Sequence, residues 1–160
     1  MCLDGVFAYR QQKPRPDAAP AMPLITYLAE DNETIAQNLI ETLQEICPVK
    51  VTGLGATQAE ATAWLKGHDE RWDLAIIDLF LKEGSGLGVL ACCRNRKPHQ
   101  KVVVLTNYAT PDIRRRAREL RADAVFDKSS ELEQLFAYCI EQTRQAEKPS
   151  EQPNPQAWQH

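Results

Sequence analysis

Residues 101–106 read KVVVLT, and this run decides the fold, because four β-branched or leucine side chains follow one another without interruption. Two similar short apolar runs precede it, LITYLA at residues 24–29 and DLAIID at residues 73–78. Short runs of this kind are typical of strands that are buried on both faces of a sheet. The three runs therefore predict the centre of a sheet that is covered on both sides.

Helical patterns separate these strands. Thr57 and Glu60 form a capping box at the start of one predicted helix, and Thr110 precedes Pro111 as an N-cap precedes an N1 proline at the start of another. The periodicity predicts helices at residues 32–46, 57–66, 87–96 and 111–120, and a fifth after Ser130 that carries the stripe Leu132, Leu135, Phe136, Cys139 and Ile140.

Two weaker strands complete the pattern. Residues 49–54 alternate between apolar and polar side chains, as an edge strand does, and residues 124–126 form a short apolar run. In the predicted helix at 87–96 we expect Leu87, Leu90 and Ala91 to face the core.

A strand followed by a helix thus occurs five times. Strands that are joined by helices run parallel, and the helices then cover both faces of the sheet. Right-handed crossovers give an α/β fold with a doubly wound five-stranded parallel sheet, a (βα)5 arrangement. Its usual strand order is 2-1-3-4-5, and ligands bind beyond the carboxyl ends of the strands, between strands 1 and 3.

Composition limits the class of protein. The 160 residues carry 19 Lys and Arg against 22 Asp and Glu, a net charge of −3, which disfavours electrostatic binding to nucleic acid or to an anionic membrane. No run approaches the ~18 apolar residues of a membrane span. The five cysteines contain no C-x-x-C pair, which indicates a reduced, cytoplasmic compartment.

The distribution of prolines and polar residues predicts one folded domain with two flanking segments. We expect the domain at residues 23–146, after an N-terminal extension at 1–22 that is disordered or not native. Residues 147–160 are expected to form a disordered, proline-rich tail.

Polar side chains follow the strands at the edge where a ligand is expected. Glu30 and Asp31 follow the first strand, Asp78 ends the third, Thr106 ends the fourth, and Lys128 follows the fifth. Three clustered carboxylates repel one another unless a cation joins them, and an all-oxygen cluster with room for water suits Mg²⁺. The lysine and the threonine hydroxyl suit phosphoryl oxygens. The central aspartate is placed to attack phosphorus as a nucleophile.

Four segments, LITYLAEDN, LAIIDLFLKEGSG, VVVLTNYA and AVFDKSS, occur in this order within residues 23–146. With these segments the chain resembles the receiver domain of two-component response regulators, which implies the flavodoxin-like receiver fold. The resemblance implies that Asp78 is the phosphoacceptor and that it holds Mg²⁺ together with Glu30 and Asp31. It also implies that Phe80 lends its backbone carbonyl to the metal.

The resemblance further makes Thr106 the switch threonine and Lys128 the phosphate-sensing lysine, but the residues around them depart from the family pattern. Ser129 stands where a proline usually follows the lysine, which removes the usual reason for a cis peptide bond, since a non-proline cis bond costs ~2.5–4 kcal/mol. Val125 occupies the position of the usual switch aromatic, with Phe126 next to it, so the aromatic readout is expected to be absent or rewired.

Three more side chains are expected to modulate the site. Asn107 follows the threonine where the family usually has a smaller residue, which predicts a narrower phosphate site. Phe80 and Tyr108 occupy positions that, in the family, tune hydrolysis of the acyl phosphate, so bulky rings there predict slower entry of water.

The function that follows is a stand-alone receiver that accepts a phosphoryl group on Asp78 from a histidine kinase or a histidine phosphotransfer protein. The predicted flanks of 22 and 14 residues are too short for an output domain. Output is therefore expected through a downstream protein target, a homodimer or onward transfer of the phosphoryl group. The protein is not expected to be an enzyme.

Three alternatives stay open. A pseudo-receiver would keep the fold and act as a constitutive interaction module without phosphorylation. An aspartate-nucleophile phosphatase needs a second acidic residue two positions after the nucleophile, where this chain has Phe80. A nucleic-acid adaptor would use the arginine-rich helix, which carries Arg114, Arg115, Arg116, Arg118 and Arg121.

Overall fold

The computed structural model describes residues 22–147. Most of the predicted extension at 1–22 and of the predicted tail at 147–160 therefore lies outside the described residues. Glu147, the first residue of that predicted tail, is the last residue of a helix.

Five parallel strands form one sheet in the order β2-β1-β3-β4-β5, which confirms the predicted fold. The strands are β1 (Leu24–Ala29), β2 (Val49–Gly55), β3 (Leu74–Ile77), β4 (Lys101–Thr106) and β5 (Ala124–Asp127). The helical segments are α2 (Glu33–Ile46), α3 (Gln58–His68), the short η1 (Asp69–Arg71), α4 (Gly86–Cys92), α5 (Pro111–Glu119) and α6 (Leu132–Glu147).

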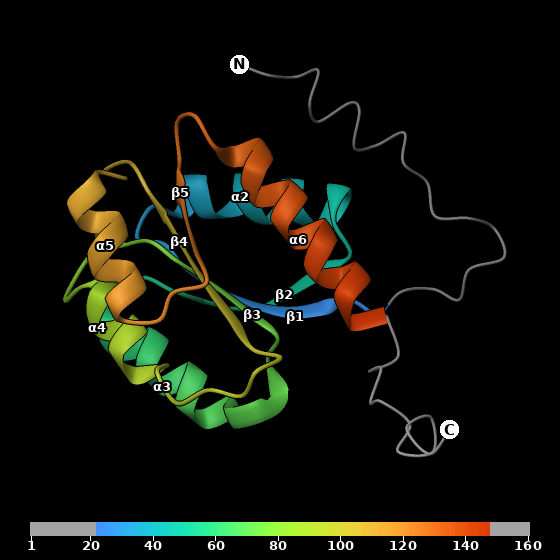
Figure 1. Cartoon of the computed structure of the whole chain (residues 1–160), viewed down its shortest axis with the longest axis horizontal. Helices are drawn as coiled ribbons and strands as arrows, with labels where there is room; N and C mark the ends of the chain where they lie inside the picture. The colour runs from blue at the N-terminus through green and yellow to red at the C-terminus, as the bar shows by residue number, and fades with distance from the viewer. Residues whose placement is uncertain (1–21, 148–160) are drawn as a thin grey trace, which may run out of the picture.

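Helices cover both faces of the sheet (Figure 1). Helices α2 and α6 pack on one face and α3, α4 and α5 on the other. Alternate residues of β4 serve the two cores, because successive side chains of a strand point to opposite faces. Val103 and Leu105 join the core under α2 and α6, and Val102 and Val104 join the other.

Polar side chains set the starts of the helices, because the first backbone N–H groups of a helix have no partner within it. The Asn32 side chain accepts a hydrogen bond from Ile35 N–H at 3.0 Å at the start of α2. The hydroxyl of Thr57 accepts one from Glu60 N–H at 3.1 Å at the start of α3. These bonds fix the residue at which α2 begins after β1 and the residue at which α3 begins after β2.

One predicted helix ends early. The segment expected to be helical over 87–96 is helical only over Gly86–Cys92. Cys93 N–H bonds to Leu90 O at 3.0 Å, a tighter turn than the α-helix, and the Arg96 side chain bonds to Cys93 O and so holds the chain in that turn. The prediction for Ala91 is also wrong, since Ala91 is exposed.

No helix within residues 22–147 is long and apolar enough to cross a membrane.

The cores predict which leucines matter for stability. Leu135 of α6 is fully buried, whereas Leu54 of β2 is 41% exposed. We expect Leu135→Ala to lower the free energy of unfolding by about 2–5 kcal/mol, because it removes packed methyl groups and leaves a cavity. Leu54→Ala deletes the same atoms and should cost less than about 1 kcal/mol. Urea unfolding followed by circular dichroism measures both, and equal losses would contradict this packing.

Candidate functional site

Two buried carboxylates stand side by side at the carboxyl edge of the sheet. Glu30 directly follows β1 and Asp78 directly follows β3. Glu30 is only 4% exposed and Asp78 only 6%. The register of the two strands pairs Ala29 with Ile77, so the next residue of each strand lies opposite the other. The Asp78 N–H group donates to Ala29 O at 2.9 Å and fixes this arrangement.

A third carboxylate completes the acidic cluster. Asp31 is exposed, and one carboxylate oxygen from each of Glu30, Asp31 and Asp78 lies within 4.8 Å of the others. An oxygen-only set with one open side fits a hard divalent cation that keeps some of its waters. The structure therefore brings together the three carboxylates that the sequence predicted for Mg²⁺.

Lys128 supplies the positive charge of the site. It comes from the turn after β5, and its amine donates to Glu30 Oε2 and to Asp78 Oδ2, the latter at 2.7 Å. Its side chain is only 11% exposed. Buried carboxylates without a partner are strongly destabilising, so this amine is the counter-charge that permits both acids to be buried.

The electrostatics of the site follow from burial and pairing. Burial raises the pKa of Glu30, and the Asp78 charge raises it further, while the Lys128 amine acts in the opposite sense and does not cancel the rise. Burial alone would lower the pKa of Lys128, but its hydrogen bonds to Asp78 and Glu30 outweigh burial, and the net pKa is raised. Lys128 is therefore charged at neutral pH.

Thr106 ends β4 at the same edge and is fully buried. Its hydroxyl accepts a hydrogen bond from Tyr108 N–H at 3.2 Å. Its carbonyl accepts one from Lys128 N–H at 2.9 Å. The backbones that carry the threonine and the lysine are therefore joined directly.

Two aromatic rings form a rim beside Asp78. Phe80 and Tyr108 are 53% and 59% exposed, and their ring centroids lie 5.0 Å apart in an edge-to-face arrangement. The Phe80 N–H group also donates to Asp78 Oδ1 at 3.1 Å, which holds the backbone of Phe80 against the predicted phosphoacceptor. Asn107, beside Tyr108, is exposed.

Val125 and Phe126 lie on opposite faces of β5. Val125 is half-buried against the core under α3, α4 and α5, whereas Phe126 is buried in the other core, with its ring 5.8 Å from that of Tyr138. Phe126 is therefore part of the α6 packing and does not replace the missing aromatic at Val125. Among residues 22–147 no peptide bond is cis, so the Lys128–Ser129 bond is trans.

One residue that holds the site together was missed from the sequence. Gln58, at the start of α3, accepts a hydrogen bond from Ser85 N–H at 2.9 Å and so fixes the loop that follows Asp78. A Cβ on Gly86 would lie 2.3 Å from Asp78 O, so this loop closes tightly only because residue 86 is glycine. No periodic pattern relates Gln58 to Ser85, since they are 27 residues apart.

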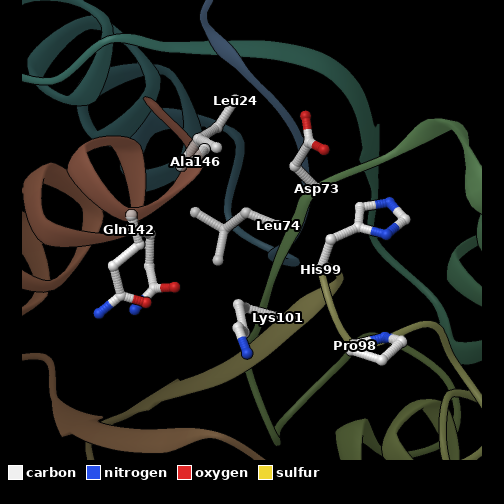
Figure 2. A pocket seen from close by; sticks show the side chains of 9 residues that line it. Leu24, Asp73, Leu74, Pro98, His99, Lys101, Gln142 and Ala146 are labelled. Atoms are coloured by element: carbon white, nitrogen blue, oxygen red, sulfur yellow. The ribbon is translucent and has the colours of Figure 1, made fainter. Parts of the chain in front are cut away.

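A hollow lies at the opposite edge of the sheet. It has a volume of about 220 Å³ and lies where β1, β3 and β4 begin, beside the last turns of α6. Figure 2 shows its apolar and polar lining, which includes Leu24, Leu74, Ala146, Lys101, His99 and Gln142. None of the predicted site residues, all of which the structure describes, lines it.

Comparison with known proteins agrees with this arrangement. The response regulator receiver domain family matches residues 26–139. The DNA-binding transcriptional activator DevR/DosR of Mycobacterium tuberculosis is 27% identical over 86 residues, which cover 54% of this chain and 39% of that protein. The chain therefore spans less than half the length of this curated relative.

Solved structures share the fold. A DNA-binding response regulator of the LuxR family from Staphylococcus aureus has a TM-score of 0.67 and 19% identity, over 75% of this chain and 98% of that chain. A Burkholderia pseudomallei response regulator, solved with a phosphorylated aspartic acid, a calcium ion and citrate, has a TM-score of 0.62 and 22% identity, over 77% and 70%.

Receiver domains of this family bind a divalent metal ion and interact with histidine kinases. The acidic cluster of Glu30, Asp31 and Asp78 is compatible with such an ion. With the family matched over residues 26–139, this chain belongs to the response regulator receiver domain family of two-component systems.

Proposed function

We propose that this receiver accepts a phosphoryl group on Asp78 from a phosphorylated histidine of a kinase or a phosphotransfer protein. The observation that supports this most directly is the position of Asp78, whose carboxylate lies within 4.8 Å of those of Glu30 and Asp31 and accepts a hydrogen bond from the Lys128 amine. A carboxylate oxygen of Asp78 forms the new P–O bond while the P–N bond of phosphohistidine breaks and the imidazole leaves with a proton.

Glu30, Asp31, Asp78 and the Phe80 carbonyl would hold the metal, which we propose to be Mg²⁺. Bound there, the ion supplies positive charge for the phosphoryl oxygens. Lys128 is the second source of positive charge, because its amine already contacts Asp78 and needs only a short displacement to bind a phosphoryl oxygen. The buried hydroxyl of Thr106 could donate a hydrogen bond to a phosphoryl oxygen at the same edge.

Phosphorylation would shift the populations of the inactive and active conformations of the domain. The phosphoryl group adds ~1.5–2 negative charges. Two new hydrogen bonds to it, from Lys128 and Thr106, are worth about 1.5–3 kcal/mol each, whereas moving a switch from 1:99 to 99:1 takes about 5.5 kcal/mol. Because Lys128 gives up its present bond to Asp78 to make one of these bonds, the net gain lies below that figure, and we expect a population shift that does not reach completion. Water later hydrolyses the acyl phosphate to inorganic phosphate and restores the Asp78 carboxylate, which is signalling chemistry and not turnover of a general substrate.

We further propose that this domain passes its signal on through contacts with a protein target. The stand-alone organisation expected from the sequence stays a prediction, because DevR/DosR and the Staphylococcus aureus protein are described as DNA-binding regulators. A pseudo-receiver that works without phosphorylation is the second candidate. The half-buried Val125 favours it, because this side chain has no ring to rotate.

Metal binding is tested by thermal unfolding. We expect saturating Mg²⁺ to stabilise the protein, by about 2.7 kcal/mol when the free ion is 100 times its dissociation constant. Asp31→Asn should abolish most of this gain, because Asp31 is the open acid of the cluster. Asp112→Asn removes the charge of an exposed aspartate of α5, and this variant should keep the stabilisation by Mg²⁺. An equal Mg²⁺ effect in both variants would contradict the site.

Phosphorylation is tested by the intact mass of the protein after incubation with acetyl phosphate and Mg²⁺. We expect one phosphoryl adduct on the wild type, none on Asp78→Ala and none when the metal is removed. The Asp112→Asn variant is the matched control and should be modified like the wild type. A wild type that stays unmodified, also with a panel of kinases, would favour the pseudo-receiver.

The aromatic rim is tested by the lifetime of the phosphorylated form. Because the Phe80 and Tyr108 rings stand in contact beside Asp78, we expect Tyr108→Ala to hydrolyse several times faster than the wild type. Leu54→Ala, which removes an exposed apolar side chain elsewhere, is the control. Equal dephosphorylation rates for Tyr108→Ala and the wild type would rule out shielding by the rim.

A further inference from the structure

Arg114 differs from the other arginines of α5 in its surroundings. It is half-buried, whereas Arg115, Arg116 and Arg118 are exposed. Its guanidinium donates to three partners, Ala109 O at 3.1 Å, Val125 O at 3.0 Å and Glu131 Oε1. The partners belong to three different segments of the chain, so Arg114 ties these segments together.

Glu131 extends this tie to the turn that carries Lys128. The same carboxylate oxygen that accepts from Arg114 also accepts from Asp127 N–H at 3.0 Å. Asp127 Oδ1 in turn accepts from Ser129 N–H at 2.8 Å. Lys128 is therefore held between two residues whose backbones are both fixed in this network. The hydrogen bond from Arg114 lowers the pKa of Glu131 and keeps it charged at neutral pH.

Ala109 extends the tie in the other direction. It lies in the turn that follows Thr106, in which Tyr108 N–H donates to the threonine hydroxyl and Thr110 N–H donates to Tyr108 O at 2.8 Å. The guanidinium of Arg114 therefore joins the two turns that carry Thr106 and Lys128. A lysine at this position could not make the three bonds, because only the guanidinium presents a planar fork of donors.

We propose that Arg114 and Glu131 are positioning residues for phosphoryl transfer: they hold the two turns in one arrangement, so that the Lys128 amine stays against Asp78. This inference rests on the proposed function. The Lys128 amine can donate to Glu30 and to Asp78 together only when its backbone lies within reach of both, so a displaced turn changes the place of the amine. A displacement of about 1 Å from the reactive geometry can slow a reaction by up to about 100-fold.

The test is the rate at which acetyl phosphate modifies Asp78 at saturating Mg²⁺. We expect Arg114→Met and Glu131→Gln to be about 10- to 100-fold slower than the wild type, and Arg114→Lys to restore little of the rate. Arg115→Met is the matched control, because within residues 22–147 the ion pairs of Arg115 are those with Asp112 and Glu119 of its own helix. It should keep the wild-type rate.

Two further readouts separate positioning from general damage. The Mg²⁺ affinity of Arg114→Met should equal that of the wild type, because neither Arg114 nor Glu131 belongs to the acidic cluster. In a Lys128→Ala background, Arg114→Met should add no further slowing, because its effect acts through that amine. A wild-type rate for Arg114→Met, a matching loss of Mg²⁺ affinity, or full additivity with Lys128→Ala would each overturn the inference.

Amide chemical shifts of the unmodified protein distinguish a failure of this inference from a failure of the proposed function. We expect Arg114→Met to shift the amides of both Tyr108 and Lys128, and Arg115→Met to shift neither. If the wild type takes up no phosphoryl group, the proposed function fails, and these shifts still show whether the tie exists. Unchanged chemical shifts of the Tyr108 and Lys128 amides in Arg114→Met would overturn the proposed role of Arg114.

Discussion

Two carboxylates are buried next to each other at the carboxyl edge of this sheet, and the amine of Lys128 is what permits it. Glu30 and Asp78 are held opposite each other by the register of β1 and β3, and each accepts a hydrogen bond from that amine. Leaving such buried charges without their partner costs about 3–5 kcal/mol. The site therefore depends on a contact between residues that are 98 and 50 positions apart. Only a fold that brings the end of β5 to the ends of β1 and β3 can form it.

The rest of the structure supports this contact. Strands that are buried on both faces present a rigid edge, and the loops beyond that edge are fixed by side chains. Gln58 fixes the loop after β3, and Arg114 with Glu131 joins the loop after β4 to the turn after β5. The aromatic rings of Phe80 and Tyr108 are exposed at this edge, as are Asp31 and Asn107. Asp78 thus lies between the rigid edge of the sheet and loops that are joined to one another by hydrogen bonds.

The sequence predicted the elements whose signals are local. The bounds of β1 and β4 are those of the runs LITYLA and KVVVLT, because an uninterrupted apolar run can be buried only in a doubly covered sheet. The five predicted site residues lie together because parallel strands bring their carboxyl ends to one edge. The end of α4 was missed because the Arg96 side chain determines it from outside the helix. The faces of Val125 and Phe126 could not be told apart in so short a strand, and neither Gln58 nor the Arg114–Glu131 pair has a periodic signal.

We propose that Asp78, and no other acid of the cluster, carries the phosphoryl group. Borohydride reduces an aspartyl phosphate to homoserine, so treating the phosphorylated protein and sequencing its peptides by mass spectrometry locates the modified residue. The structure predicts homoserine at position 78 alone, because Asp78 follows β3, which lies between β1 and β4, and so stands between Glu30 at the end of β1 and Thr106 at the end of β4. Homoserine at position 31, or a phosphorylated protein with no homoserine at position 78, would contradict the assignment of Asp78 as the phosphoacceptor.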